Sequence, residues 1–482
     1  MLDLSSLNQL VTGGAGDGAL IGAMPIDALN EITKALAVGS DRDPPASFQP
    51  GDGFAYRVEN LDPVERTITF TEKNIVMWKL LQKQGVDNTV FEWNEVQSYG
   101  QDGMSGFIAD SALPEVHDTT IARRTGYVKY MAVQGSVSHV STLVKTAGSA
   151  NLIASETQKK MTQLVGMIER SLMDADETLD AGAWSGFPAQ LRAAVTAGIA
   201  PTSCITDKRG ATLTVQDLEL AGADASSEPR WGQLTDLFAA PLVKSGLNIA
   251  QYANLRGQIG VGAGPGGAIG ADFDVVKTST GQMNVHSMPF ISRTPQLLAN
   301  GAGDATRRPS APILAVAPAQ AADAASQFGS GDTGDYAYSV VARNRHGISV
   351  PLSVGSVTVS TAGNRVRFSV QAAPGPQTLW FEVYRTTRNG SIAYRIARFA
   401  NPNAGFSTVQ FDDLNATLPN TFEAIAFDWN PLVVNFKQLA PTMKIGLAQV
   451  DLFQRWAQLI YGTPALQIAR RAQLFTNLGV VS

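Results

Sequence analysis

The sequence is short of the residues on which several protein classes depend. It has one cysteine, Cys204, and four histidines among 482 residues, so no disulfide can form within the chain and little material exists for a metal site. No apolar run approaches the roughly 18 uninterrupted residues of a membrane span. The first residues also lack the basic segment and apolar stretch of a secretory signal. These absences exclude a disulfide-stapled secreted scaffold and predict folding in the cytoplasm where the chain is made.

Charge is also scarce. Charged residues make up 16% of the chain, against about 25% in typical soluble domains, while 44% of the residues are hydrophobic. That composition is enough for a core and excludes global disorder. With 37 Lys and Arg against 42 Asp and Glu, the net charge is −5. A dedicated nucleic-acid reader is therefore excluded, and contact with a polyanion is predicted to be local and non-specific.

Catalytic signatures are missing as well. No GxxxxGK[ST], HExxH or GxSxG motif occurs, and the GAGPGG stretch at 262–267 matches GxGxxG without the preceding strand and following helix that a dinucleotide site needs. This stretch is predicted to be a flexible loop. We predict no catalytic, cofactor-binding or metal-binding residues, and expect that the protein is not an enzyme.

Three further features could support chemistry. Asp174, Asp176, Glu177 and Asp180 could do acid–base work, but no His, Lys or aromatic residue lies close in sequence to shift a pKa, so a solvated helix end is predicted. Cys204 is interpreted as a small, half-buried residue. The pairs Arg123-Arg124 and Arg470-Arg471 could meet a phosphate backbone or carboxylates on a neighbouring subunit, and the subunit contact is favoured.

The first half of the chain contains one strong helix and one long loop. Residues 25–38 have helical apolar spacing, and 66–81 begin with strand alternation before turning helical. Strand-like runs between 90 and 144 flank a polar, Gly-containing middle, which predicts a projecting hairpin supported by a partner. Residues 151–176 carry one apolar stripe and predict a helix about 39 Å long.

The second half changes character twice. Residues 184–308 indicate a Gly/Ala-rich α/β region with a helix at 231–242. From 312 to 422 short alternating strands separated by turn residues predict a β-sandwich, whose core candidates are Tyr336, Tyr338, Trp380, Phe381 and Tyr384. The last sixty residues return to α/β, with a helix expected at about 449–460. The sandwich is therefore predicted to be an insertion.

Several segments together resemble one protein family. They are VFEWNEVQSYGQDGMSGFIADSALPEVHD, RRTGYVKYMAVQGSVSHVSTLVKT, NLIASETQKKMTQLVGMIERSLMDAD, AWSGFPAQL and the C-terminal WAQLIYGTPALQIARRAQLFTNLG. This combination resembles major capsid proteins of tailed bacteriophages of the large contractile-tail group. The resemblance implies an α+β Hong Kong 97-type fold with an N-terminal arm, an E-loop, a P-domain with a long spine helix, and an A-domain. The segments DYAYSVVARNRHGISVPLS and LWFEVYRTT are similar to immunoglobulin-like or fibronectin type III modules.

The resemblance implies a division of the chain. The expected parts are an N-terminal arm (1–60), E-loop and P-domain strands (61–150), the spine helix (151–183), a first A-domain part (184–309), an inserted immunoglobulin-like sandwich (310–425), and the A-domain remainder with closing P-domain strands (426–482).

The implied function is structural. Copies of the chain would self-assemble into hexamers and pentamers of an icosahedral head shell that encloses the phage genome, built in the host cytoplasm and ending in the virion. Implied partners are further copies, with portal, scaffold and decoration proteins as candidates, and no membrane. Two alternatives remain open: an encapsulin-like cargo shell of the same fold, and a carbohydrate-binding or glycan-degrading surface protein with a fibronectin-like module. The latter predicts a carboxylate pair flanked by aromatics near Trp184 or Trp231.

Overall fold

The computed structural model describes most of the chain beyond its first 66 residues. The described residues are 67–100, 107–108, 110, 113, 118–144, 151–255 (without side chains at 251–255), 274–291, 294–402, 408–449 and 451–480. The helix predicted at 25–38 and the glycine loop at 262–267 lie outside these residues.

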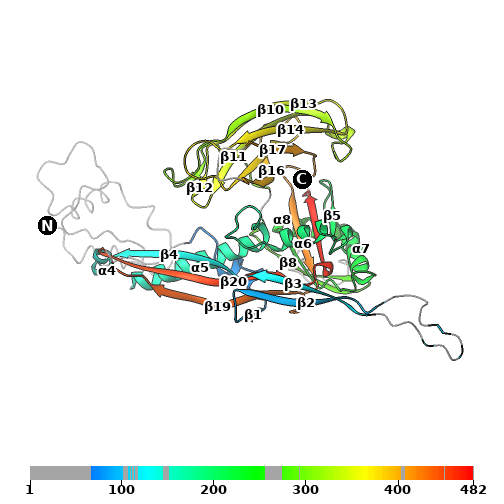
Figure 1. Ribbon diagram of the computed structural model, residues 1–482, viewed down its shortest axis with the longest axis horizontal. Helices are drawn as coiled ribbons and strands as arrows, with labels where there is room; N and C mark the ends of the chain where they lie inside the picture. Colours follow the sequence, from blue (N-terminus) through cyan, green and yellow to red (C-terminus); the bar gives the residue numbers. More distant parts are fainter. Residues whose placement is uncertain are drawn as a thin grey trace, which may run out of the picture. The chain divides into compact units, whose positions relative to one another are not determined.

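The two longest described strands belong to a four-stranded sheet with the order β1-β19-β20-β4 (Figure 1). Its members are β1 (Lys83–Gly85), β4 (Lys129–Ser138), β19 (Val434–Gly446) and β20 (Phe453–Leu466). Helix α5 (Leu152–Asp174) lies along this sheet and buries Leu164, Ile168 and Leu172. The Asn151 side chain caps it by accepting a hydrogen bond from the Ala154 amide at 3.1 Å. The predicted long helix is confirmed.

The helix predicted at 449–460 is wrong, because this segment forms most of β20. Leu452, Trp456, Leu459 and Ile460 fall at helical spacing, which explains the error. The strand prevails because its backbone finds partners on both sides, β19 on one and β4 on the other. Trp456 and Ile460 are buried in that arrangement.

A six-stranded sheet with the order β5-β21-β18-β6-β8-β7 forms the centre of the α/β region. Its strands are β5 (Ile205–Asp207), β6 (Asp236–Ala239), β7 (Val275–Thr278), β8 (Gly281–Ser287), β18 (Phe422–Phe427) and β21 (Ala472–Leu478). Helices α6 (Phe187–Thr196), α7 (Val215–Ser226) and α8 (Pro241–Leu255) pack against it.

The helix predicted at 231–242 is also wrong. All four residues of β6 are buried, and the strand pairs with β18 on one side and with β8 on the other. The helix starts only at Pro241, where a proline has no amide to lose and fits a first turn.

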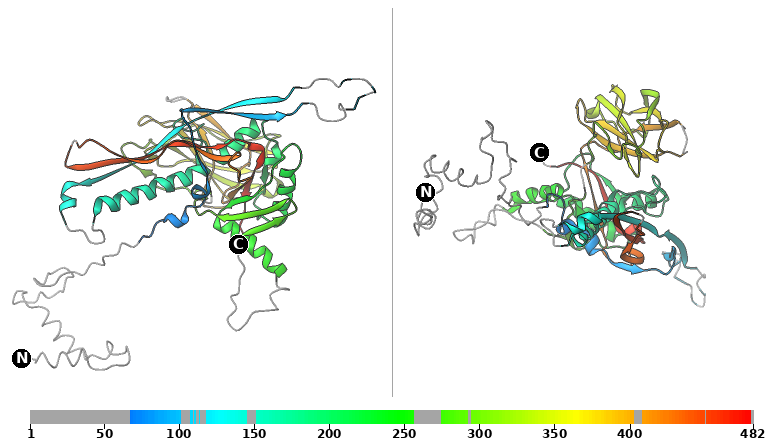
Figure 2. Two further views of the ribbon diagram at one scale, coloured as in Figure 1. Left: turned by 90° about the horizontal axis from the view of Figure 1, so that it is seen from below. Right: turned by 90° about the vertical axis from the view of Figure 1, so that its left-hand side faces the viewer.

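Two further sheets face each other as a β-sandwich between β8 and β18 in the sequence (Figure 2). One has the order β10-β14-β17; the other has β16-β15-β11-β12-β9, with β13 paired to β11. The strands are β9 (Ala302–Gly303), β10 (Ile313–Ala322), β11 (Gly334–Asn344), β12 (Gly347–Ile348), β13 (Leu352–Val359), β14 (Asn364–Gln371), β15 (Trp380–Thr386), β16 (Ala393–Ala400) and β17 (Thr408–Asp413).

The sandwich has its own apolar core, which shares no residue with the core of the rest of the chain. Of the predicted core residues, Tyr336, Tyr338, Phe381 and Tyr384 are buried, and Trp380 is half-buried. Its immunoglobulin-like identity and the domain boundaries stay predictions. The expected end at residue 425 falls inside β18, which pairs with β6 and β21 of the six-stranded sheet.

The remaining elements are a hairpin and short helices. Strands β2 (Val90–Ser98) and β3 (Thr120–Tyr127) form the hairpin. The short helices are η1 (Glu72–Asn74), α3 (Met77–Leu80), α4 (His139–Leu143), η3 (Thr202–Cys204), η4 (Ser330–Asp332) and η5 (Ala469–Arg471). The strand expected to open 66–81 is absent from described residues 67–71, and the strand run before residue 144 ends at Ser138, whose side chain caps α4.

Candidate functional site

The β2–β3 hairpin is a two-stranded ribbon that pairs with no third strand in the described part of the chain (Figure 1). Its register runs from Val90 opposite Tyr127 to Val96 opposite Ile121. Neither strand contains a buried residue. Because an isolated two-stranded ribbon is only marginally stable in water, this ribbon needs contacts beyond its own pairing. The predicted hairpin is confirmed, although most of its polar middle lies outside the described residues.

The more exposed face of the ribbon carries apolar pairs at both ends. Val96 and Ile121 are 50% and 58% exposed, and the Val90–Tyr127 pair stands at the other end. Between these pairs the face is polar, with an ion pair between Arg123 and Glu92. This face could contact a partner through two apolar pairs, one at each end, with charged residues between them.

The opposite face fixes the root of the ribbon to the body. Phe91 and Trp93 stack with ring centroids 5.8 Å apart. The Trp93 indole donates a hydrogen bond to the Gln467 carbonyl at 3.3 Å. A Cβ at Gly126 would lie 2.4 Å from the Phe91 ring, so only glycine allows this ring to lie across the ribbon. The root is therefore anchored to the body through β2, and Gly126 of β3 makes room for the Phe91 ring.

The two arginine pairs find their partners inside the chain. Arg123 pairs with Glu92, and Arg124 with Glu95 at 3.2 Å. Arg470 donates from Nε to the Ile199 carbonyl at 2.7 Å. Arg471 meets Asp428 at 3.3 Å. Three of these arginines pair with carboxylates of the same chain, and Arg470 bonds to a carbonyl, so their side chains are engaged without a phosphate. The subunit contact stays a prediction.

The sequence predicted a solvated helix end for the acidic group after α5. Glu177 is exposed, but the prediction is wrong for Asp174, which is bonded to the sandwich. Asp174 accepts a hydrogen bond from Arg395 of β16 at 2.8 Å, and Arg398 donates to its main-chain carbonyl at 2.6 Å. Burial alone would raise the pKa of Asp174, but these two guanidinium groups hold it below the usual range. The carboxylate thus joins α5 to the sandwich.

Two more ionic contacts reach the sandwich from the body. Arg345, in the turn between β11 and β12, pairs with Asp180 at 2.6 Å, and this bond lowers the pKa of the Asp180 carboxyl. Arg209, after β5, donates to the Gln327 carbonyl at 2.9 Å and to the Asn415 carbonyl at 2.6 Å. Together with Asp174, these contacts define what we call the polar joint.

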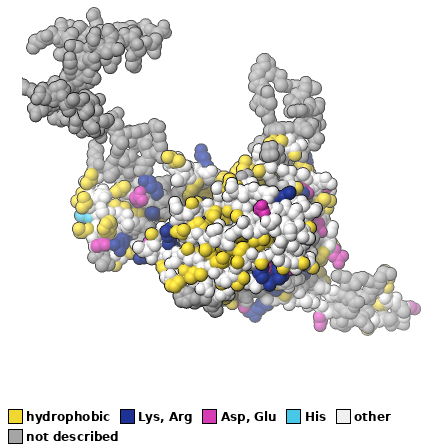
Figure 3. All heavy atoms as spheres, turned by 90° about the horizontal axis from the view of Figure 1, so that it is seen from above, with side chains coloured by type: hydrophobic (Ala, Val, Ile, Leu, Met, Phe, Trp, Pro, Cys, Tyr) yellow, Lys and Arg dark blue, Asp and Glu magenta, His cyan; other side chains and the backbone are white. Residues whose placement is uncertain are grey.

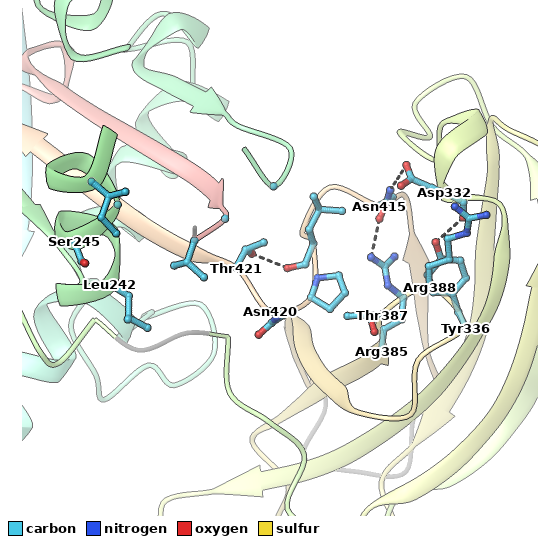
Figure 4. A pocket seen from close by; sticks show the side chains of 17 residues that line it. Leu242, Ser245, Asp332, Tyr336, Arg385, Thr387, Arg388, Asn415, Asn420 and Thr421 are labelled. Carbon is cyan, nitrogen blue, oxygen red and sulfur yellow. Dashed lines mark hydrogen bonds between the residues drawn. The ribbon is translucent and has the colours of Figure 1, made fainter. Parts of the chain in front are cut away.

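A hollow lies beside the polar joint, between α8 and the sandwich (Figure 4). It has a volume of about 680 Å³. Leu242 and Ser245 of α8 line one side, and Tyr336, Arg385 and Arg388 line the other. The sandwich is therefore held to α8 without close apolar packing at this place.

A buried charge network holds the sandwich end that faces this hollow. Arg385 and Asp413 are both buried and pair at 2.6 Å. The Tyr338 hydroxyl donates to Asp413 at 2.8 Å, and the Arg385 guanidinium lies 5.2 Å from the Phe328 ring. Burial and the Asp413 carboxylate raise the pKa of Tyr338, so its hydroxyl remains a donor. The ion pair and the tyrosine hydroxyl satisfy the Asp413 carboxylate, whereas Nε of Arg385 is buried without a hydrogen-bond partner, and a structural role accounts for the ion pair.

The outer face of the sandwich has apolar patches and long uncharged stretches (Figure 3). Residues 311–322 and 347–363, which contain β10 and β13, include no Asp, Glu, Lys or Arg. Ile313, Val316 and Val350 are exposed there. Pro318 interrupts β10, and the strand has register shifts, both of which hinder pairing with another strand. This face is suited to side-chain contact more than to strand addition.

Cys204 and the histidines do not form a reactive site among the described residues. Cys204 is fully buried, and burial raises the pKa of its thiol, so it is inert packing. The His286 ring contacts Asp236 at 2.7 Å and stacks on Phe238. No group of three His, Cys, Asp or Glu side chains in the described ranges could hold a metal ion. No helix within those ranges is long and apolar enough to cross a membrane.

Sequence reasoning missed the buried carboxylate of Glu169. It lies on the apolar side of α5 and accepts hydrogen bonds from the amides of Val76 (3.0 Å), Met77 (2.8 Å) and Trp78 (2.7 Å). Burial raises the pKa of Glu169, although the three amides limit the rise. This carboxylate fixes α3 to α5. The only signal in the sequence was one acidic residue between Ile168 and Leu172 of the stripe.

Comparison with known proteins identifies the family. The model of the family described as SU10 major capsid protein matches residues 52–305, more than half of the chain. The chain belongs to the SU10 major capsid protein family. It is 22% identical over 481 residues to the major capsid protein of Staphylococcus phage S25-3, with 94% of this chain and 98% of that protein covered.

Solved structures that resemble the chain include one of Gordonia phage Cozz and one of an encapsulin complex. The Gordonia phage Cozz chain has a TM-score of 0.42 and 9% identity, covering 91% of this chain and 97% of its own. A chain of the SrpI encapsulin complex from Synechococcus elongatus PCC 7942 has a TM-score of 0.41 and 8% identity, covering 88% and 94%. Such distant likenesses do not separate a phage shell from an encapsulin, whereas the family match does.

Proposed function

We propose that copies of this major capsid protein form hexamers and pentamers of an icosahedral head shell that encloses the phage genome. Family membership supports the capsid role. The structural observation that supports the assembly mode is the β2–β3 ribbon, which exposes apolar pairs and lacks a third strand among the described residues.

In this proposal the ribbon lies across a neighbouring copy, which supplies the contacts it lacks in its own chain. Its anchored root keeps the direction of the ribbon fixed, and its outward apolar pairs become buried on the neighbour. Individual contacts can be weak, because each subunit repeats them around a closed shell and multivalency multiplies their effect. Residues 61–150 then act as E-loop and P-domain strands, and 151–183 as the spine.

The proposal extends to place and partners. Assembly occurs in the host cytoplasm, and the product is the virion capsid. The genome is held without sequence-specific contact, since the chain carries a net charge of −5 and the pairs Arg123-Arg124 and Arg470-Arg471 are engaged within the chain. Portal, scaffold and decoration proteins belong to the proposal as partners without assigned residues.

The two alternatives gain no support. The sequence relatives are phage capsid proteins, whereas nothing specific favours an encapsulin-like cargo shell. The glycan-binding alternative needs an aromatic wall near Trp184 or Trp231. Trp184 is buried, and its indole donates to the Ser171 hydroxyl at 3.1 Å, so it cannot stack on a sugar. Trp231 is exposed, but no second aromatic ring packs beside it among the described residues, so it does not form a wall.

Substitution on the ribbon tests the proposal. Val96→Asp places a charge on the outward apolar pair, and Asn94→Asp places the same charge on the polar centre of the same strand and face, opposite Arg123. Both positions are on an exposed ribbon, so the fold of each variant should persist. Light scattering and electron microscopy should show that V96D raises the concentration needed for shell formation by about tenfold or more, while N94D stays near wild type. Equal assembly of V96D and wild type would contradict the ribbon's role.

A further inference from the structure

Trp231 stands apart from the other tryptophans of the chain. All seven lie in the described residues, and six are buried or half-buried, whereas the Trp231 side chain is 65% exposed. It sits in the connection between α7 and β6. Large aromatic side chains are costly to leave in water, and tryptophan is enriched at the centres of protein interfaces.

The backbone at Trp231 is unfavourable for such a residue. Its φ is +50°, in the left-handed region that glycine and asparagine tolerate best. Of the five other non-glycine residues with positive φ in the described chain, four are asparagines. Since most of the indole is exposed, its contacts within the chain offset little of the energetic cost of this backbone conformation. A backbone outlier of this kind points to a role other than stabilising the chain's own fold.

The connection is nevertheless held firmly. The neighbouring Arg230 is buried and pairs with Asp224 at 2.5 Å, and it also donates to the Gln473 side chain and the Ala472 carbonyl at 2.8 Å. The Gly232 amide donates to the Ala225 carbonyl at 2.8 Å. A Cβ at Gly232 would lie 2.6 Å from Cγ of Arg471, so the chain passes here without room to shift. The indole is thus presented on a rigid support, which lowers the entropy cost of docking.

We propose that Trp231 is a preformed anchor that docks onto a neighbouring copy of this chain in the assembled shell. The inference rests on the proposed function, because that function supplies the neighbour. A protein partner suits the connection better than nucleic acid does. The exposed charged residue of this connection is Glu228, whereas the Arg230 guanidinium is buried and hydrogen-bonded within the chain.

Two measurements test this anchor. Hydroxyl-radical footprinting read by mass spectrometry compares the oxidation of Trp231 in free subunits and in assembled empty shells. We expect at least a fivefold slower oxidation in the shells, with the half-buried Trp429 changing less. Equal oxidation of Trp231 in both states would overturn the inference while leaving shell formation intact. Protection that requires packaged DNA would also overturn it, in favour of a nucleic-acid contact.

Substitution separates an interface role from a structural one. Trp231→Gly removes the indole and suits the positive φ. Relief of the left-handed strain offsets the greater entropy of the unfolded glycine chain, so unassembled W231G should unfold at a temperature close to that of wild type. We expect its assembly threshold to rise about tenfold or more, with Trp231→Asn behaving alike and Trp231→Phe intermediate. Normal assembly of folded W231G or W231N would refute the anchor. If wild-type protein forms no shells at all, the proposed function itself fails.

Discussion

Replacing Glu169 by alanine should detach α3 from α5. The carboxylate accepts three backbone hydrogen bonds, from Val76, Met77 and Trp78. Because Met77 is buried, water cannot replace the carboxylate as the acceptor for its amide. Hydrogen bonds to a charged group contribute about 1.5–3 kcal/mol each, and an orphaned buried donor costs about 1–3 kcal/mol. Removing the carboxylate also relieves its own burial cost.

These opposing effects leave a local loss of about 3 kcal/mol, and 1.4 kcal/mol corresponds to a factor of ten. Hydrogen–deuterium exchange of the amides at 76–78 in the full chain should therefore accelerate by roughly a hundredfold in E169A. Glu156→Ala on the same helix is the matched control, because Glu156 makes only a surface pair with Lys159 at 3.2 Å, and its exchange pattern should stay unchanged. Exchange in E169A within threefold of wild type would refute the reasoning.

Three further predictions concern the sandwich. Asp174→Asn should weaken the polar joint by about 1 kcal/mol, since the ion pair with Arg395 is partly exposed. Because the native pKa of Asp174 lies below its unfolded value, its contribution is present above about pH 3.8 and is lost as the pH falls through the native pKa. The exchange protection of β16 amides should therefore decline in that pH range in wild type but not in D174N, with Asp87→Asn as the control. Arg385→Ala should destabilise the sandwich by about 3–5 kcal/mol, measured as a lowered denaturation midpoint, because it leaves Asp413 buried without its cation. Arg388→Ala loses one surface hydrogen bond to the Gly331 carbonyl and should change the free energy of unfolding by less than about 1 kcal/mol. Equal effects of the two substitutions would contradict the role of the buried charge network. Replacing residues 310–416 by a short Gly/Ser linker keeps β18 and should leave shell assembly intact, and a soluble variant that forms no shell-sized particle would show that the sandwich is not modular.

Local patterns predicted those elements whose partners lie nearby in sequence. The stripe of α5 fixes one helical face, and the alternation of β11, β14 and β15 fixes the inward faces of the sandwich, so both were predicted. The strands β6 and β20 were mistaken for helices because their apolar residues fit both periods. Only pairing with strands distant in the sequence decides between the two.

The contacts of the candidate site depend even more on distant partners. Asp174 meets Arg395 and Arg398 across 221 and 224 positions, and Glu169 meets the Val76 amide across 93. Helix-end carboxylates are usually solvated, so nothing in the local sequence marked Asp174 as a link to the sandwich, and the only local signal for Glu169 was its place within the apolar stripe. The exposed position of Trp231 likewise follows from a left-handed backbone that the sequence around it does not encode.

Cryo-electron microscopy of the purified chain tests the central claim most directly. The account predicts closed icosahedral particles in which the β2–β3 ribbon of each subunit lies on a neighbouring copy. Monomers that persist at high concentration, with the amides of β2 and β3 already protected from exchange in the isolated chain, would contradict it.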